Sequence, residues 1–280
     1  LAMGIAGAGN SGTLLSTLFA PRLAAAFGWQ AAFGFAVLPV AIVMALFALL
    51  AKDSPNRPPV VKGSQYLEVL RESDTGWFCV LYCMTFGGFV GLASYLTVFF
   101  HAQYGLTKVQ AGDFTTLAVL AGSFLRPVGG MISDLIGGYR LLLLLLTGAG
   151  LCLAVVGMLP SASVALGLLV ATMGLLGMGN GAVFQMLPQR FPDRTGMLTG
   201  IVGAAGGIGG FLLPSLLGIV KDRTGQYGLG FFLCASAMLG AAVILLHLGQ
   251  TWLETWNTKA ASRAGVFSYR SKPDVSGAAA

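Results

Sequence analysis

A single arginine stands in the middle of a long apolar stretch of this chain. Arg126 lies 12 residues after Phe114 and 8 residues before Asp134, which places it about 12 Å from the nearer end of its helix at 1.5 Å per residue. If the stretch crosses a bilayer, inserting an arginine there costs at least about 2.5 kcal/mol. A guanidinium donates parallel hydrogen bonds to oxyanions. The position therefore favours contact with an anion or a water-filled path.

The alternative is a purely structural role for Arg126. The side chain would then snorkel to the membrane surface, bond to backbone carbonyl groups or pair with an acid on a neighbouring helix. Snorkelling is unfavourable at this depth, and Asp113 and Asp134 lie near the two ends of the same stretch. Pro127 frees one backbone carbonyl of its helical donor, which suits the wall of a cavity.

Two aromatic residues lie at a depth similar to that of Arg126. Tyr82 and Phe86 are spaced i, i+4 and share one helix face. They lie about 9 and 15 Å from the inner end of their helix. An aromatic pair at this spacing more often packs a helix interface than forms a site, but the shared depth makes a common site with Arg126 the other interpretation.

Small residues recur at helical spacing in two segments. The later segment places four glycines within about 80° of one helix face, and the earlier segment repeats the start of the pattern. These residues are Gly200, Gly203, Gly207 and Gly210, and Gly4, Gly7 and Ser11. Close helix packing explains them, and close approach of bare backbone to a small substrate is the alternative.

Three side-chain amides lie inside apolar stretches. Asn10 aligns with Gly206 when the two glycine-rich segments are superimposed, at a depth where a polar side chain is rarely left facing lipid. Asn180 and Gln185 share a third stretch. Either of these two can simply bond to a neighbouring helix.

One loop between apolar stretches has a distinctive pattern. It reads GMISDLIGGYR from Gly130 to Arg140. Asp134 can accept from the N-terminus of a helix, and Gly137 permits a tight turn. We expect Gly130, Asp134, Gly137 and Arg140 to form a gating or packing element without chemistry of its own.

The composition indicates that membrane helices position all these residues. The chain of 280 residues has 16 basic and 10 acidic residues, about 9% charged, and 56% hydrophobic residues, whereas soluble domains are about 25% charged. The mean hydropathy is +0.81. The four cysteines lie in apolar runs and predict neither a disulfide framework nor a zinc site. We expect an all-α membrane protein without metal or cofactor.

Eight apolar stretches are long enough to span a bilayer at about 20 residues each. They cover 1–20, 30–51, 76–100, 114–133, 141–159, 164–187, 197–220 and 229–250. A polar, proline-containing linker over 52–74 follows the second stretch. We expect two helices of one half in 1–51, a six-helix half in 75–250, and a polar, disordered tail in 251–280.

The basic residues predict the orientation. Eleven of the 16 lie on the side of the linker and tail, four lie on the opposite side, and Arg126 lies on neither. Because basic loops stay in the cytoplasm, we expect a multi-pass protein of the cytoplasmic (inner) membrane with linker and C-terminus inside. Four tryptophans stand at predicted helix ends, as in aromatic belts: Trp29, Trp77, Trp252 and Trp256.

A weak internal repeat relates residues 4–35 to 200–231 through seven identities in 32 positions. This offset of about six spans is typical of two six-helix halves. The chain also begins in apolar sequence without an initiator methionine or signal peptide. On this interpretation the chain is a fragment with eight of twelve helices.

Several segments resemble one family. The pattern G-x-x-x-D-x-x-G-x-x-R resembles the motif between helices 8 and 9 of the major facilitator superfamily. GIAGAGNSGT and GAAGGIGGFLLP are similar to the paired signature motifs of its nitrate/nitrite porters, whose eighth and tenth helices resemble FLRPVGGMISD and GMGNGAVFQMLPQRF. The resemblance covers helices 5 to 12.

This resemblance implies a non-enzymatic secondary transporter that moves nitrate or nitrite by alternating access. Arg126 matches the eighth-helix arginine that pairs with the anion, and Tyr82 and Phe86 match aromatic residues that border it. The signature segments supply the other expected pocket residues: Gly7, Asn10, Ser11, Gly203, Gly206 and Gly207. The family's second arginine, on helix 2, has no counterpart in this chain. We expect a small inorganic anion and the lipid bilayer as partners, no nucleic acid, and a monomer.

Other functions remain open at this stage. The same fold also carries other small or organic anions, and a piece without helix 2 can be inactive. A membrane enzyme is disfavoured by the lack of an intramembrane histidine pair, an acid pair or a phosphate-binding loop. A sensor would need a folded output domain. No acid lies at mid-membrane, so anion exchange and a proton route through the missing helices both remain.

Overall fold

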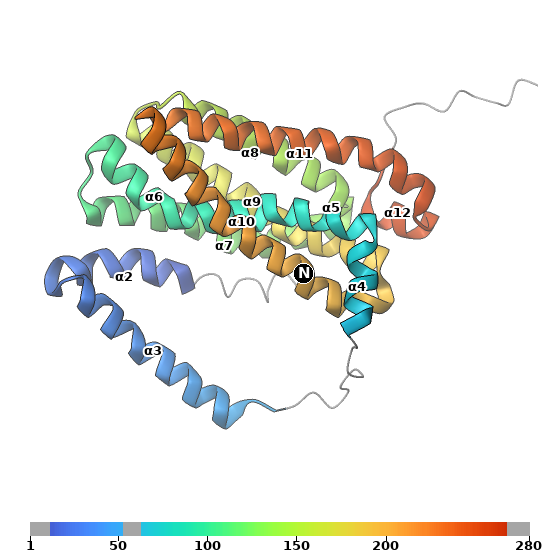
Figure 1. Cartoon of the computed structure of the whole chain (residues 1–280), viewed down its shortest axis with the longest axis horizontal. Helices are drawn as coiled ribbons and strands as arrows, with labels where there is room; N and C mark the ends of the chain where they lie inside the picture. The colour runs from blue at the N-terminus through green and yellow to red at the C-terminus, as the bar shows by residue number, and fades with distance from the viewer. Residues whose placement is uncertain (1–11, 53–62, 268–280) are drawn as a thin grey trace, which may run out of the picture.

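The computed structural model describes residues 12–52 and 63–267, and every element in these ranges is helical. Figure 1 shows the arrangement of the elements. In order they are α2 (Gly12–Phe27), α3 (Trp29–Leu50), α4 (Gly63–Arg71), α5 (Ser73–Tyr82), the π-helical turn η2 (Cys83–Gly87), α6 (Gly88–Tyr104), α7 (Lys108–Ile136), α8 (Gly138–Gly157), α9 (Ala162–Arg190), the 3₁₀ turn η3 (Pro192–Arg194), α10 (Thr195–Thr224), α11 (Gly228–Thr255) and α12 (Thr258–Ala264).

Seven helical segments are long and apolar enough to cross a membrane. They are Trp29–Leu50, Ser73–Tyr104, Lys108–Ile136, Gly138–Gly157, Ala162–Arg190, Pro192–Thr224 and Gly228–Thr255. They match the second to the eighth stretches expected from the sequence. The first stretch lies mainly outside the described residues and continues as α2. The expected all-α membrane fold is confirmed.

Glycines bring the helices of the main bundle into backbone contact. A Cβ at Gly181 on α9 would lie 2.7 Å from the backbone nitrogen of Gly130 on α7, and a Cβ at Gly87 in η2 would lie 2.7 Å from Cα of Gly209 on α10. Small residues at helix interfaces permit such close approach. Much of the glycine excess in the composition therefore serves helix packing.

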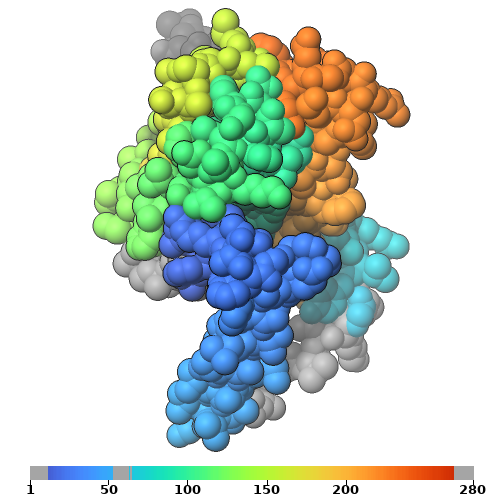
Figure 2. Space-filling model, turned by 90° about the vertical axis from the view of Figure 1, so that its left-hand side faces the viewer, coloured from blue at the N-terminus to red at the C-terminus, as the bar shows by residue number. Residues whose placement is uncertain are grey.

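The helices α2 and α3 lie at the edge of this bundle. Figures 1 and 2 show α3 projecting away from the other helices, whereas α2 lies against α7. Neither helix contains a buried residue, and Leu38 and Phe47 on α3 are 70% and 73% exposed. Apolar surface of this extent requires contact with lipid or with further helices.

The two polar segments contain more structure than the sequence predicts. Within the expected linker 52–74, α4 occupies Gly63–Arg71, and residues 53–62 lie outside the described ranges. The expectation of a disordered tail is wrong for residues 251–267, because α11 continues to Thr255, α12 follows, and Ala264 and Val266 are buried. Residues 268–280 are not described.

Asp74 on α5 explains why the chain after residue 250 is ordered. Its carboxylate accepts from Nε1 of Trp252 at 2.9 Å, from Nε1 of Trp256 at 3.1 Å and from Nε of Arg190. Both tryptophans are buried, so the expectation that they lie in an aromatic belt is wrong. Tryptophan near a helix end is an ambiguous signal, because a carboxylate from another helix satisfies the indole N–H as well as the membrane interface does.

Candidate functional site

Arg126 is buried inside the bundle without an acidic partner. It lies on α7 with 5% of its surface exposed, 10 residues before the helix ends at Ile136, which is about 15 Å along the axis. Its Nη2 donates to Oη of Tyr82 at 3.2 Å, and its Nε has no hydrogen-bond partner among the described residues. No carboxylate pairs with it in the described part of the chain. An unmade hydrogen bond of a buried group costs about 1–3 kcal/mol, so this arginine has unused capacity for a ligand.

Two stacked aromatic rings form one wall beside Arg126. The ring centroids of Tyr82 and Phe86 are 5.1 Å apart and their planes differ by 6°. Cζ of Arg126 lies 5.6 Å from the centroid of Phe86, within the range of a cation–π contact. The structure therefore brings together the three residues that the sequence placed at similar depths.

A π-helical turn separates α5 from α6 at this wall. It occupies Cys83–Gly87 and includes Phe86, whereas Tyr82 is the last residue of α5. Single π-helical turns inside α-helices occur frequently at functional sites. The sequence predicted one uninterrupted helix here, because neither the residue types nor their spacing distinguishes a π turn from an α turn.

Gly206 on α10 lies directly against both rings. A Cβ at this position would lie 2.6 Å from Cδ1 of Tyr82 and 2.8 Å from Cδ1 of Phe86. The absence of a side chain is thus what allows α10 to pack on the aromatic wall. Gly203 and Gly207 differ from it, because a Cβ at either position would meet no atom of the described residues within 4 Å.

Phe184 belongs to the same cluster, and the sequence analysis missed it. Its ring centroid lies 4.8 Å from that of Tyr82, on the side of α9. A phenylalanine in an apolar stretch gives no signal by itself. Only the packing of α9 against α5 shows where it lies.

Three of the expected site residues, Gly7, Asn10 and Ser11, lie outside the described residues. The structure places Arg126, Tyr82, Phe86 and Gly206 together. It leaves Gly203 and Gly207 on a face of α10 that no other described element touches at these positions.

The expectation of a loop over Gly130–Arg140 is wrong, because Gly130 and Asp134 lie on α7, Arg140 lies on α8, and only Gly137 lies between the two helices. This helix junction packs against the end of the described chain. Gly137 has φ +89°, and a Cβ there would lie 2.5 Å from the nitrogen of Gly265 and 2.6 Å from the carbonyl carbon of Ala264. Nε of Arg140 donates to the carbonyl oxygen of Gly265 at 3.1 Å. The junction between α7 and α8 therefore packs on the segment after α12, and Asp134 in the last turn of α7 is exposed.

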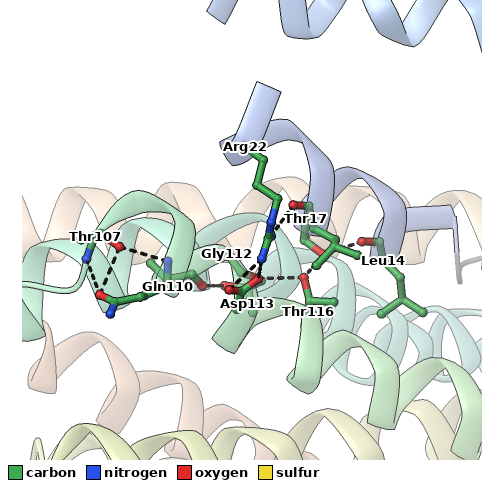
Figure 3. A network of polar contacts seen from close by, with 11 residues as sticks. Leu14, Thr17, Arg22, Thr107, Gln110, Gly112, Asp113 and Thr116 are labelled. Atoms are coloured by element: carbon green, nitrogen blue, oxygen red, sulfur yellow. Dashed lines mark hydrogen bonds and ion pairs between the residues drawn. The ribbon is translucent and has the colours of Figure 1, made fainter. Parts of the chain in front are cut away.

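A second polar network joins α2 to α7 near the opposite end of the bundle. Figure 3 shows Arg22 on α2 reaching Asp113 on α7, with 2.7 Å between Nη2 and Oδ1. Oγ1 of Thr116 donates to Oγ1 of Thr17 at 2.9 Å. Arg22 is one of the four basic residues expected on the side opposite the linker. It lies inside α2 and is paired across the two predicted halves.

A bundle of membrane-length helices around a buried arginine, with no acidic partner among the described residues, defines a multi-pass membrane protein with a polar centre. Residues 1–214 match the family described as Major Facilitator Superfamily. This match covers more than half of the chain, which therefore belongs to the major facilitator superfamily.

Curated relatives narrow this assignment. The chain is 33% identical over 261 residues to the "Nitrite extrusion protein" of Bacillus subtilis, covering 91% of this chain and 64% of that protein. It is 34% identical over 266 residues to the "Probable nitrate transporter NarT" of Staphylococcus carnosus, covering 89% and 64%. It is 32% identical over 255 residues to the "Probable nitrate/nitrite transporter NarK2" of Mycobacterium tuberculosis, covering 87% and 63%. The resemblance to nitrate/nitrite porters is confirmed, and the chain spans just under two thirds of the length of these relatives.

Proposed function

We propose that this chain carries an anion-binding part of a transporter that moves nitrate, nitrite or both by alternating access. The observation that supports the proposal is the buried guanidinium of Arg126, which has an unpaired Nε and an aromatic wall beside it. The names of the relatives indicate which anions to test. The protein would lie in the cytoplasmic membrane with the linker and C-terminus inside, as the distribution of basic residues predicts.

The chemistry of the anion suits this arrangement. Nitrate and nitrite are small, planar and delocalised, so a guanidinium fork can donate two parallel bonds to two oxygens. The face of Phe86 can cover the planar ion. Gly206 keeps α10 close to the rings of Tyr82 and Phe86. We expect this close packing to exclude bulkier anions.

Arg126→Lys in the full chain tests this proposal, because lysine keeps the charge and loses the planar fork. We expect uptake of nitrate and nitrite into proteoliposomes to fall at least tenfold in kcat/KM. Arg223→Lys on the exposed end of α10 is the control and should transport normally. Kinetics of Arg126→Lys equal to those of the wild type would refute the proposal.

A carrier for another small anion is the second candidate. Nothing in the geometry of Arg126 alone distinguishes nitrate from other planar oxyanions such as formate. Competition assays with formate, chloride and sulfate during nitrate uptake separate the two functions. We expect none of these ions to displace nitrate at tenfold excess.

A further inference from the structure

The two side-chain amides of α9, Asn180 and Gln185, have different hydrogen-bond partners in the structure. Gln185 is used as a bridge between helices: its Oε1 accepts from the backbone nitrogen of Gly138 at 3.0 Å, and its Nε2 donates to the carbonyl of Arg263 at 3.1 Å. Asn180 is 1% exposed, and among the described residues neither its acceptor Oδ1 nor its donor Nδ2 has a hydrogen-bond partner. Helix packing therefore accounts for Gln185 and leaves Asn180 unexplained.

The neighbours of Asn180 on α9 show which way it faces. Leu176 and Phe184 lie one turn before and one turn after it, on the same side of the helix. A Cβ at Gly88 would lie 3.2 Å from Cδ1 of Leu176, and the ring of Phe184 packs on Tyr82 with centroids 4.8 Å apart. Both contacts are with the segment that carries the stacked aromatic pair. Asn180 faces the same segment.

The glycines on either side of Asn180 bring α9 close to the site. A Cβ at Gly179 would lie 2.8 Å from Cγ2 of Thr85 in the π-helical turn. A Cβ at Gly181 would lie 3.0 Å from the carbonyl oxygen of Arg126 on α7. The amide is thus held between the turn that carries Phe86 and the backbone of the site arginine.

We infer that Asn180 is a further anion-binding residue, whose amide donates a hydrogen bond to the oxyanion held by Arg126. This inference rests on the proposed function of the Arg126 site. A guanidinium fork engages two oxygens of a planar oxyanion, and a neutral amide N–H donates to a further acceptor without changing the charge of the site. Oγ of Ser123, one turn before Arg126, also has no partner among the described residues. Arg126, Ser123 and Asn180 thus each have hydrogen-bonding capacity that a small polar ligand can use.

The test measures the Kd for nitrate and for nitrite of the purified full chain and three variants. Asn180→Leu removes the amide at similar volume and should raise both Kd values at least tenfold. Asn180→Asp keeps the shape but replaces the amide donor by a carboxylate, which only accepts hydrogen bonds. Nitrate binding should therefore be lost at neutral pH. It should return as the pH falls, because the protonated carboxyl can donate. The matched control is Thr172→Val on the same helix, because the hydroxyl of Thr172 is buried and already donates to the carbonyl of Leu168 at 2.8 Å. It should bind as the wild type does.

The outcomes separate the inference from the proposed function. If the wild type binds nitrate or nitrite and Asn180→Leu binds it with equal affinity, the role of Asn180 is wrong while the proposed function stands. If the wild type binds neither ion, the proposed function itself is wrong, and the inference fails with it. Should Asn180→Leu fail to fold, Asn180→Asp decides: equal nitrate affinity at neutral and low pH would overturn the inference, because a purely structural amide gives no pH dependence of binding.

Discussion

Nη2 of Arg126 donates a hydrogen bond of 3.2 Å to Oη of Tyr82, which lies on another helix 44 residues earlier in the chain. The phenol orients the guanidinium, and the stacking of Tyr82 on Phe86 holds the phenol in turn. The position of the buried charge therefore depends on an aromatic pair as well as on α7.

Tyr82→Phe removes this hydrogen bond and keeps the ring. A hydrogen bond to a charged group contributes about 1.5–3 kcal/mol, so we expect the Kd for nitrate to rise roughly tenfold or more while the protein still folds. Tyr104→Phe is the matched control, since Oη of Tyr104 donates to the carbonyl of Pro160 at 2.8 Å, away from Arg126. Equal Kd values for Tyr82→Phe and the wild type would show that the phenol does not orient the arginine.

Gly206→Ala and Gly207→Ala make a matched pair on α10. The methyl group at position 206 would collide with the rings of Tyr82 and Phe86, and overpacking of this kind costs about 1–3 kcal/mol. The methyl group at 207 would meet no described atom within 4 Å, and alanine gains up to about 1 kcal/mol of helix propensity over glycine. We expect a lower midpoint of thermal unfolding and slower uptake only for Gly206→Ala. Similar effects of both substitutions would contradict the described contact of α10 with the rings.

Arg22 and Asp113 form an ion pair between α2 and α7, with side chains 41% and 39% exposed. Solvent screens such a pair, so its coupling should be only about 0.2–1 kcal/mol. We expect Arg22→Asp and Asp113→Arg each to lower the midpoint of thermal unfolding slightly, and the double exchange to restore part of the loss.

A double-mutant cycle on these two residues measures the coupling. Substitutions of Arg223, an exposed arginine on α10, provide the control for a change of charge alone. A coupling energy of zero would show that the pair does not hold α2 against α7.

The sequence predicted the membrane helices well, because their hydrophobic runs are longer than any other feature of the chain. Spacing and depth offered a common site of Arg126, Tyr82 and Phe86 as one of two interpretations, and the resemblance to nitrate/nitrite porters implied it. Spacing and depth are properties of one helix at a time, so they could not decide between the two. The π-helical turn and the contact of Phe184 were missed, since both depend on how one helix meets another. Trp252 and Trp256 show the same limit: their partner Asp74 lies 178 and 182 residues earlier in the chain.

The glycine stripe illustrates a partial prediction. The spacing correctly indicated a helix face made of small residues on α10. It did not show which of the glycines touch another helix, and the contacts fall on Gly206, Gly209 and Gly210 rather than on Gly203 and Gly207. The contact face of a helix is set by its neighbours, and a single sequence does not contain their positions.

The cluster around Asp74 has a practical consequence. The chain has four tryptophans, and two of them donate their indole N–H groups to this one carboxylate, where α5, α9 and α11 meet. The emission of an indole depends on the charges next to its ring. Half of the tryptophans of this protein therefore report on one junction of three helices, and a rearrangement there would be visible as a spectral shift in the unlabelled chain.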